Sequence, residues 1–167
     1  MYIPDGCPGV HIHDGFGKVK YTTKGPSWGT RPSIDDHAIT ILNPGVYEIT
    51  HTLRIAGEAE AKHYWKNGVF SAKVSVCVTG DKDKKTTLNY NVVNQDNDDF
   101  KFDQTYSITT HRYLKYGDIL TAQFHDVYIE PYHGYDSTKA CYFNAALTIK
   151  QIDAKHHYGY DSGYSMP

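Results

Sequence analysis

Hydrophobic and polar residues alternate along most of the chain, and this period of two is typical of β-strands with one buried face. In residues 44–55 the following side chains fall on one face: Tyr47, Ile49, His51, Leu53 and Ile55. The residues between them are polar: Glu48, Thr50, Thr52 and Arg54. The Pro-Gly pair at 44–45 marks a turn before this run. We therefore expect a strand here, with His51 among the buried side chains.

Five later runs show the same alternation, at residues 69–81, 86–93, 105–114, 118–129 and 141–152. Their apolar sets are Val74, Val76 and Val78; Leu88, Tyr90 and Val92; Tyr106 and Ile108; Leu120, Ala122 and Phe124; and Phe143, Ala145, Leu147 and Ile149. Shorter runs occupy 18–23 and 37–42. About eight strands separated by turn residues, with hardly any helix signal, predict an all-β antiparallel sandwich or barrel.

The two ends of the chain have a different pattern. Residues 1–35 are rich in Gly, Pro and Asp, and residues 153–167 are rich in Tyr, His and Gly. Neither segment carries enough aliphatic side chains for a core of its own. We expect an extended N-terminal arm at 1–35, a β-sandwich at 36–152 and a C-terminal arm at 153–167.

Length and charge narrow the class of protein. A chain of 167 residues favours one domain. With 17 Lys and Arg against 19 Asp and Glu, the net charge of −2 disfavours a nucleic-acid binder held by phosphate contacts. No apolar run is long enough to span a bilayer, and the first ten residues lack the pattern of a secretory signal. We expect neither nucleic acid nor membrane as a partner.

The three cysteines, Cys7, Cys77 and Cys141, form no CxxC motif. Buried or idle thiols are the main expectation for all three. A bridge between Cys77 and Cys141 remains open if their strands are neighbours. Such sparse cysteine usage fits folding in a reducing cytosol.

Three short segments resemble the jelly-roll domains of tumour necrosis factor and of complement globular heads. They are the strand entry at 44–49 (PGVYEI), the Gly-Asp hairpin at 114–120 (LKYGDIL) and the closing strand at 142–149 (YFNAALTI). The resemblance covers roughly residues 37–152 and implies a jelly-roll sandwich that assembles as a homotrimer. The same architecture is similar to bacteriophage head fibres, capsid decoration proteins and spike tips.

Tyrosine is the outlier of the composition, with 15 residues against 2 Trp and 6 Phe. Tyrosine is enriched at protein interfaces because its ring is apolar and its hydroxyl is polar. We therefore expect tyrosines of the two arms to contact a neighbouring copy: Tyr2, Tyr158, Tyr160 and Tyr164. Four further aromatic residues are candidates for stacking against a sugar ligand: Trp28, Trp65, Tyr132 and Tyr135.

Metal-site signals are weak. His11 and His13 could share a metal ion on an extended segment, but the Glu that follows such a pair in cupins is missing. The acidic stretch at 94–99, with Asp96 and Asp98, could hold calcium, but it lacks the spacing of an EF-hand. Surface polar residues and a solvated loop are the simpler interpretations of the two segments.

Catalytic motifs are missing as well. The chain contains no GxSxG, HExxH or phosphate-binding glycine loop, so we expect neither an enzyme nor a cofactor. Together with the resemblance, these patterns favour a virion structural protein, made in the host cytoplasm, that acts by assembly with a capsid or other virion protein. The alternative is a receptor- or carbohydrate-binding module of a tail fibre or spike, with a host-surface glycan as ligand. The host, the partner protein and the choice between capsid and tail are not encoded in these patterns.

Overall fold

The computed structural model describes residues 1–4, 9–12, 15–59, 68–79, 86–96, 100–130 and 139–153. Its regular elements are ten strands: β1 (Val10–His11), β2 (Gly15–Lys18), β3 (Thr30–Ser33), β4 (Ala38–Ile41), β5 (Gly45–Ala59), β6 (Gly68–Thr79), β7 (Thr86–Asp96), β8 (Phe100–Leu114), β9 (Ile119–Glu130) and β10 (Lys139–Asp153). The expected all-β class is confirmed. The described residues form ten strands where about eight were expected, because β1, β2 and β3 all lie in the segment predicted as an arm. The strand expected at 18–23 is not formed, since only Lys18 belongs to a strand, as the last residue of β2.

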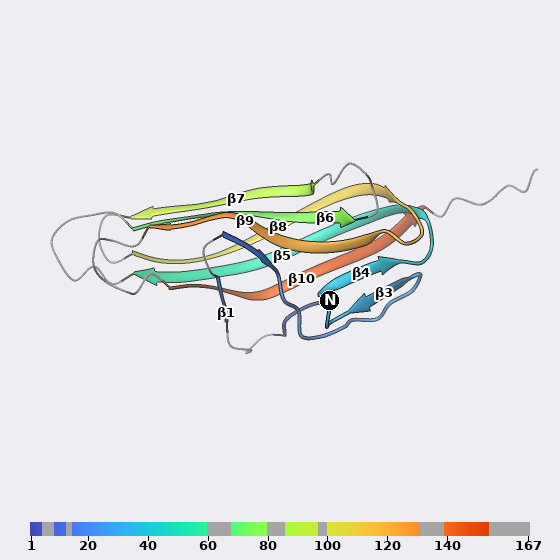
Figure 1. Cartoon of the computed structure of the whole chain (residues 1–167), viewed down its shortest axis with the longest axis horizontal. Coiled ribbons are helices and arrows are strands. Elements are labelled where there is room, and N and C mark those ends of the chain that lie inside the picture. The colour runs from blue at the N-terminus through green and yellow to red at the C-terminus, as the bar shows by residue number, and fades with distance from the viewer. Residues whose placement is uncertain are drawn as a thin grey trace, which may run out of the picture.

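The strands form two antiparallel sheets (Figure 1). One sheet has the order β1-β10-β5-β8, and the other has the order β3-β4-β9-β6-β7, with β2 paired to β9. The longest pairing joins β5 to β8, from Gly45 opposite Leu114 to Ala59 opposite Phe100. Strands that pair within a sheet, such as β5 with β8 and β10 with β5, are thus often far apart in the sequence.

The core contains the inward faces of both sheets. In β5 the alternation is realised as predicted: Tyr47, Ile49, His51, Leu53 and Ile55 are all buried. From the other sheet, the predicted sets of β6 and β9 are buried too: Val74, Val76, Val78, Leu120, Ala122 and Phe124. Burial of one face of each strand is the main favourable term for such a fold.

Strand β10 departs from strict alternation, and this corrects one prediction. Phe143 was expected on the apolar face with Ala145 and Leu147, but Tyr142 is the buried residue, with 2% of its surface exposed. The register shifts between Phe143 and Ala146, where Asn144 has a φ of 46°. A bulge of this kind changes which face successive side chains occupy. Phe143 consequently lies outside, where the Arg54 guanidinium sits 5.7 Å from the centre of its ring.

The segment expected as an N-terminal arm contributes to both sheets and to the core. β1 pairs with β10, β2 with β9 and β3 with β4. Five of its side chains are buried in the common core: Met1, Ile3, Ile12, Val19 and Tyr21. Its aliphatic side chains, though few in number, are thus placed against the sandwich.

The remaining predictions on chain organisation concern the C-terminus and the cysteines. Of the predicted C-terminal arm, only Asp153 belongs to the described residues, as the last residue of β10. Cys77 lies in β6 and Cys141 in β10, on different sheets, and no disulfide joins them. Cys7 lies outside the described residues.

Candidate functional site

The first residues of the chain form an extra strand-like segment along β10. The Met1 ammonium donates a hydrogen bond to the carbonyl of Leu147 at 2.9 Å, and the Ile3 N–H donates to that of Ala145 at 2.8 Å. On its other side, the Tyr2 N–H donates to the carbonyl of Thr23 at 3.0 Å. Burial lowers the pKa of the Met1 amino group. Backbone hydrogen bonds on both sides hold this segment in place.

A groove of about 640 Å³ lies beside this segment, and we call it the N-terminal groove. Its walls come from residues 1–4, residues 25–27, strands β3 and β4, and the part of β10 between Asn144 and Ile149. The volume falls in the range of roughly 300–1,000 Å³ that is typical of ligand pockets. No charged side chain occurs among the described residues that line it. It suits an apolar or neutral polar occupant.

Three exposed aromatic residues gather at one end of the sandwich, and we call this surface the aromatic end: Trp28, Tyr113 and Tyr116. Their exposed fractions are 90%, 39% and 73%. Figure 1 shows β4 and β10 finishing at the end where β5 begins. Such exposure of a tryptophan leaves both ring faces open to a ligand.

Hydrogen bonds of the β3–β4 region fix the aromatic end. The carbonyl of Gly29 accepts from the N–H groups of Leu42 (2.9 Å) and Asn43 (3.1 Å), which places Trp28 beside the end of β4. The Gly117 N–H donates to the carbonyl of Ile41 at 2.8 Å, which brings Tyr116 to the same strand end. Both glycines have positive φ values, 66° and 85°, that other residues rarely adopt. The two aromatic residues therefore flank one strand end.

The outer face of β5 and β8 carries a ladder of polar pairs. Arg54 and Asp103 form two hydrogen bonds, at 2.8 and 2.5 Å, and the Arg54 side chain lowers the pKa of this carboxyl. The other pairs are Thr52 with Ser107 (3.0 Å), Thr50 with Thr109 (2.9 Å) and Glu48 with His111 (3.2 Å). Cross-strand pairs of this kind stabilise a sheet and leave its outer face hydrophilic.

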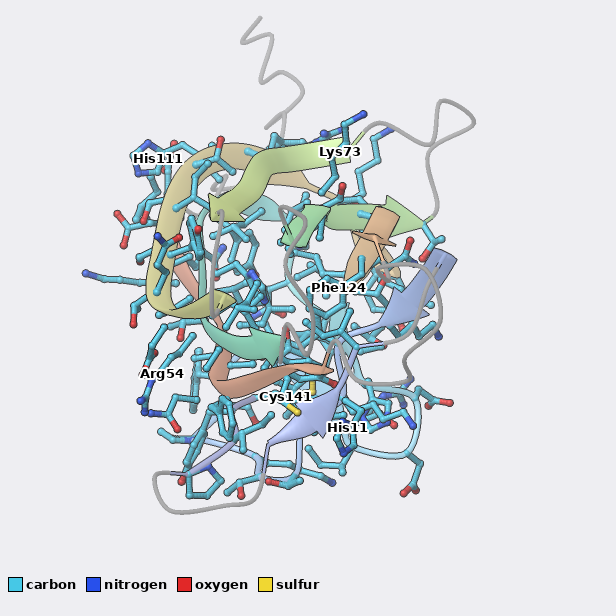
Figure 2. The ribbon with its side chains drawn as sticks, turned by 90° about the vertical axis from the view of Figure 1, so that its left-hand side faces the viewer. His11, Arg54, Lys73, His111, Phe124 and Cys141 are labelled. Atoms are coloured by element: carbon cyan, nitrogen blue, oxygen red, sulfur yellow. The ribbon has the colours of Figure 1, made fainter. Side chains whose placement is uncertain are left out.

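His11, one of the weak metal-ligand candidates, lies next to Cys141. The two residues are opposite each other on β1 and β10, with 3.3 Å between the imidazole Nδ1 and the thiol Sγ (Figure 2). His13 and Asp98 lie outside the described residues, and Asp96 ends β7. Within the described part of the chain, no three His, Cys, Asp or Glu side chains are placed to share a metal ion. The expectation that these residues are surface polar groups rather than metal ligands stays a prediction.

Other predicted residues can be placed only in part. Tyr2 is 39% exposed and lines the N-terminal groove. Trp28 belongs to the aromatic end. The remaining aromatic candidates lie outside the described residues: Trp65, Tyr132, Tyr135, Tyr158, Tyr160 and Tyr164.

Two features of these surfaces were not predicted from the sequence: the exposed ring of Tyr116 at the aromatic end, and the wall of the N-terminal groove formed by Met1 and Ile3. For Tyr116 a signal existed, because the following Gly117 and Asp118 were identified as a turn and a residue at a turn is often exposed. The wall depends on hydrogen bonds to β10, more than 140 residues away in sequence, as the Met1–Leu147 pair shows. No local pattern encodes such a contact.

His51 is a core residue. Its side chain is fully buried, and burial lowers its pKa from 6.5 to about 4. The ring is therefore neutral near pH 7. Because His51 lines neither the N-terminal groove nor the aromatic end, we assign it to the stability of the fold.

Comparison with known proteins gives no independent assignment: no protein-family model and no curated protein matches this chain. In the described part of the chain, no helix is long and apolar enough to cross a membrane.

Proposed function

We propose that the protein is a virion structural protein with a jelly-roll fold, serving as a capsid decoration, head-fibre or knob subunit. It acts through assembly into a homotrimer and through contacts with another virion protein, without catalysis. Two observations support this: the resemblance of three sequence segments to jelly-roll domains, and the way the strands pair.

Strand pairing is the observation that carries the proposal. The pairs are nested: β1 with β10, β4 with β9, β5 with β8, and β6 with β7. Nested antiparallel pairs arise when one long hairpin is folded on itself and rolled up. The rolled hairpin is closed by β10 pairing with β5 and by β9 pairing with β6. Nested pairs closed in this way support a jelly-roll fold, an architecture used by viral capsid and lectin domains.

The surface supports an assembly role. The N-terminal groove offers apolar area, and the aromatic end exposes Trp28, Tyr113 and Tyr116. Exposed aromatic residues and apolar hollows are typical of sites where proteins meet other molecules. The polar ladder between β5 and β8 keeps another face of the sandwich hydrophilic. Such a division into contact surfaces and a solvated face fits a subunit of a larger particle.

The direct test is localisation in purified particles. Antibodies raised against the recombinant chain are applied to virus particles from the organism that encodes it, with immunogold detection by electron microscopy. We expect regular labelling of the particle surface and copy numbers in multiples of three by quantitative mass spectrometry. A chain that is expressed in infected cells but missing from the particles contradicts the proposal.

The aromatic end favours a second candidate, a carbohydrate-binding module. Sugar rings bind aromatic faces through their C–H groups, and Trp28 is 90% exposed next to the strand end that Tyr116 also flanks. A glycan array probed with the wild-type protein and with Trp28→Ala tests this. Binding that is lost in the variant supports the second candidate, and an array without any binding rejects it.

A further inference from the structure

The end of β10 at Asp153 is held against the start of β5. Asp153 is the last residue of β10 and pairs with Val46 at the start of β5. Its carbonyl oxygen lies against the Cα of Gly45, where a side chain would collide with it. The Gln151 side chain adds a hydrogen bond from Nε2 to the carbonyl of Pro44, at 3.3 Å. These contacts fix the end of β10 against the turn before β5.

The N-terminal groove is lined by a part of β10 that precedes Asp153 in the sequence. β10 lines the groove between Asn144 and Ile149 and then continues to Asp153. At ~3.3 Å per residue, Asp153 lies roughly 13 Å beyond Ile149 along the strand. A chain that continues in the strand direction moves away from its own groove. It would have to reverse to enter that groove but could enter the groove of a neighbour directly.

The segment that follows has the length and chemistry of an occupant. Residues 154–167 have three tyrosines and end in Met166 and Pro167. Fourteen residues in extended conformation span roughly 46 Å, enough to cross an interface between two copies. Among the side chains of residues 154–167, only those of Lys155 and Asp161 carry a permanent charge. Tyrosine rings suit a mainly apolar groove whose lining also includes the hydroxyl groups of Ser27 and Thr30.

We propose that the N-terminal groove of each copy receives the C-terminal segment, residues 154–167, of a neighbouring copy. This inference rests on the proposed function, since it names the contact that joins copies of the chain. Tyr158, Tyr160 and Tyr164 supply the apolar contacts, and Met1, Ile3 and Ile149 form part of the receiving wall.

Photo-crosslinking in the full-length chain tests the inference. Ser27 lies on the groove and is exposed, so p-benzoylphenylalanine at this position reports on its occupant. The matched control places the same residue at Thr109, on the exposed outer face of β8. After irradiation we expect covalent dimers from the Ser27 protein, with residues 154–167 in the crosslinked peptide, and no such peptide from the Thr109 protein.

A second set of variants separates specific insertion from chance contact. The combined change Tyr158→Ala, Tyr160→Ala and Tyr164→Ala should lower the dimer yield about tenfold, because aromatic anchors dominate such contacts. The combined change His156→Ala and His157→Ala should leave it within about twofold, as expected of residues outside the anchor set. Equal losses in both variants contradict the tyrosine anchors.

Light scattering on the same protein separates this inference from the proposed function. A trimer whose crosslinks lie within one chain, or involve another segment, overturns the insertion and leaves the assembly role intact. A chain that stays monomeric overturns both.

Discussion

Gly45 and Asp153 touch through their backbones at the point where β5 begins and β10 ends. A Cβ on Gly45 would collide with the Asp153 carbonyl and would lie 2.5 Å from the Gln151 side-chain nitrogen. The glycine is therefore required by close packing, since its φ is not in the left-handed region. This contact links the two strands from which the inner part of the β1-β10-β5-β8 sheet is built.

Gly45→Ala is predicted to destabilise the protein by about 1–3 kcal/mol, the range of overpacked sites. The displaced atom is a backbone oxygen, which cannot move aside without disturbing the sheet. Gly17→Ala is the matched control, because no atom lies within 4 Å of its added Cβ. Chemical denaturation of both variants measures the difference. Equal unfolding free energies would show that the end of β10 can shift to make room for the added Cβ without loss of stability.

Acidification is predicted to destabilise the fold through His51. Its pKa is about 4 in the folded state and 6.5 when unfolded. A group with a depressed folded pKa binds its proton preferentially in the unfolded chain. The stability that neutral His51 contributes is thus complete above pH 6.5 and is lost progressively as the pH falls towards 4. The loss is on the order of 3 kcal/mol at pH 4.

Denaturation curves between pH 7.5 and 4 measure this loss, and His51→Leu should remove most of it. His37, whose pKa is lowered by burial and by Lys20, contributes in the same direction. The Arg54 side chain lowers the pKa of Asp103 from 3.8, so the stability that this carboxylate contributes is lost mainly at pH values below this window. A pH profile unaltered by His51→Leu would contradict the assignment.

Trp28 is predicted to contribute to the binding of a partner or ligand at the aromatic end and hardly at all to the free energy of unfolding. With 90% of its surface exposed, Trp28→Ala should change the unfolding free energy by less than about 0.5 kcal/mol. Tyr142→Ala provides the contrast: this ring is 2% exposed and lies 5.3 Å from the Phe124 ring, so its loss should cost about 3–5 kcal/mol. Thermal unfolding of the two variants checks the prediction, and a large loss for Trp28→Ala would place that ring in a packed environment.

Removal of residues 154–167 is predicted to weaken assembly while the fold is kept. The truncated chain retains all of β10, which ends at Asp153. Its far-ultraviolet circular dichroism should match that of the full chain, whereas its oligomers should dissociate at higher protein concentration. Normal assembly of the truncated chain would show that another surface joins the copies.

The alternation along the chain was sufficient to predict β4 to β10 and much of the core, but not β1, β2 and β3. β5 shows why: each second side chain from Tyr47 to Ile55 is buried, as a regular strand requires. The same rule failed at Phe143, because the positive φ at Asn144 and the register shift beside it are set by pairing with β5. A bulge leaves no clear mark in the local sequence.

The candidate sites were predictable to a smaller extent. Trp28 was recognised as an aromatic side chain suited to stacking, but its position beside Tyr116 depends on how β3 and the β8–β9 turn meet β4. The N-terminal groove could not be predicted at all. It requires Met1 and Ile3 to lie against Leu147 and Ala145, which only the complete fold brings about.

The mass of the full-length protein in solution, measured by light scattering across a concentration series, tests the proposed assembly most directly. A homotrimer has a mass of about 57 kDa, three times the chain mass of 18.9 kDa. We predict this value at concentrations where the fold is intact. A mass of 18.9 kDa at every concentration would contradict a role that depends on copies of this chain binding one another.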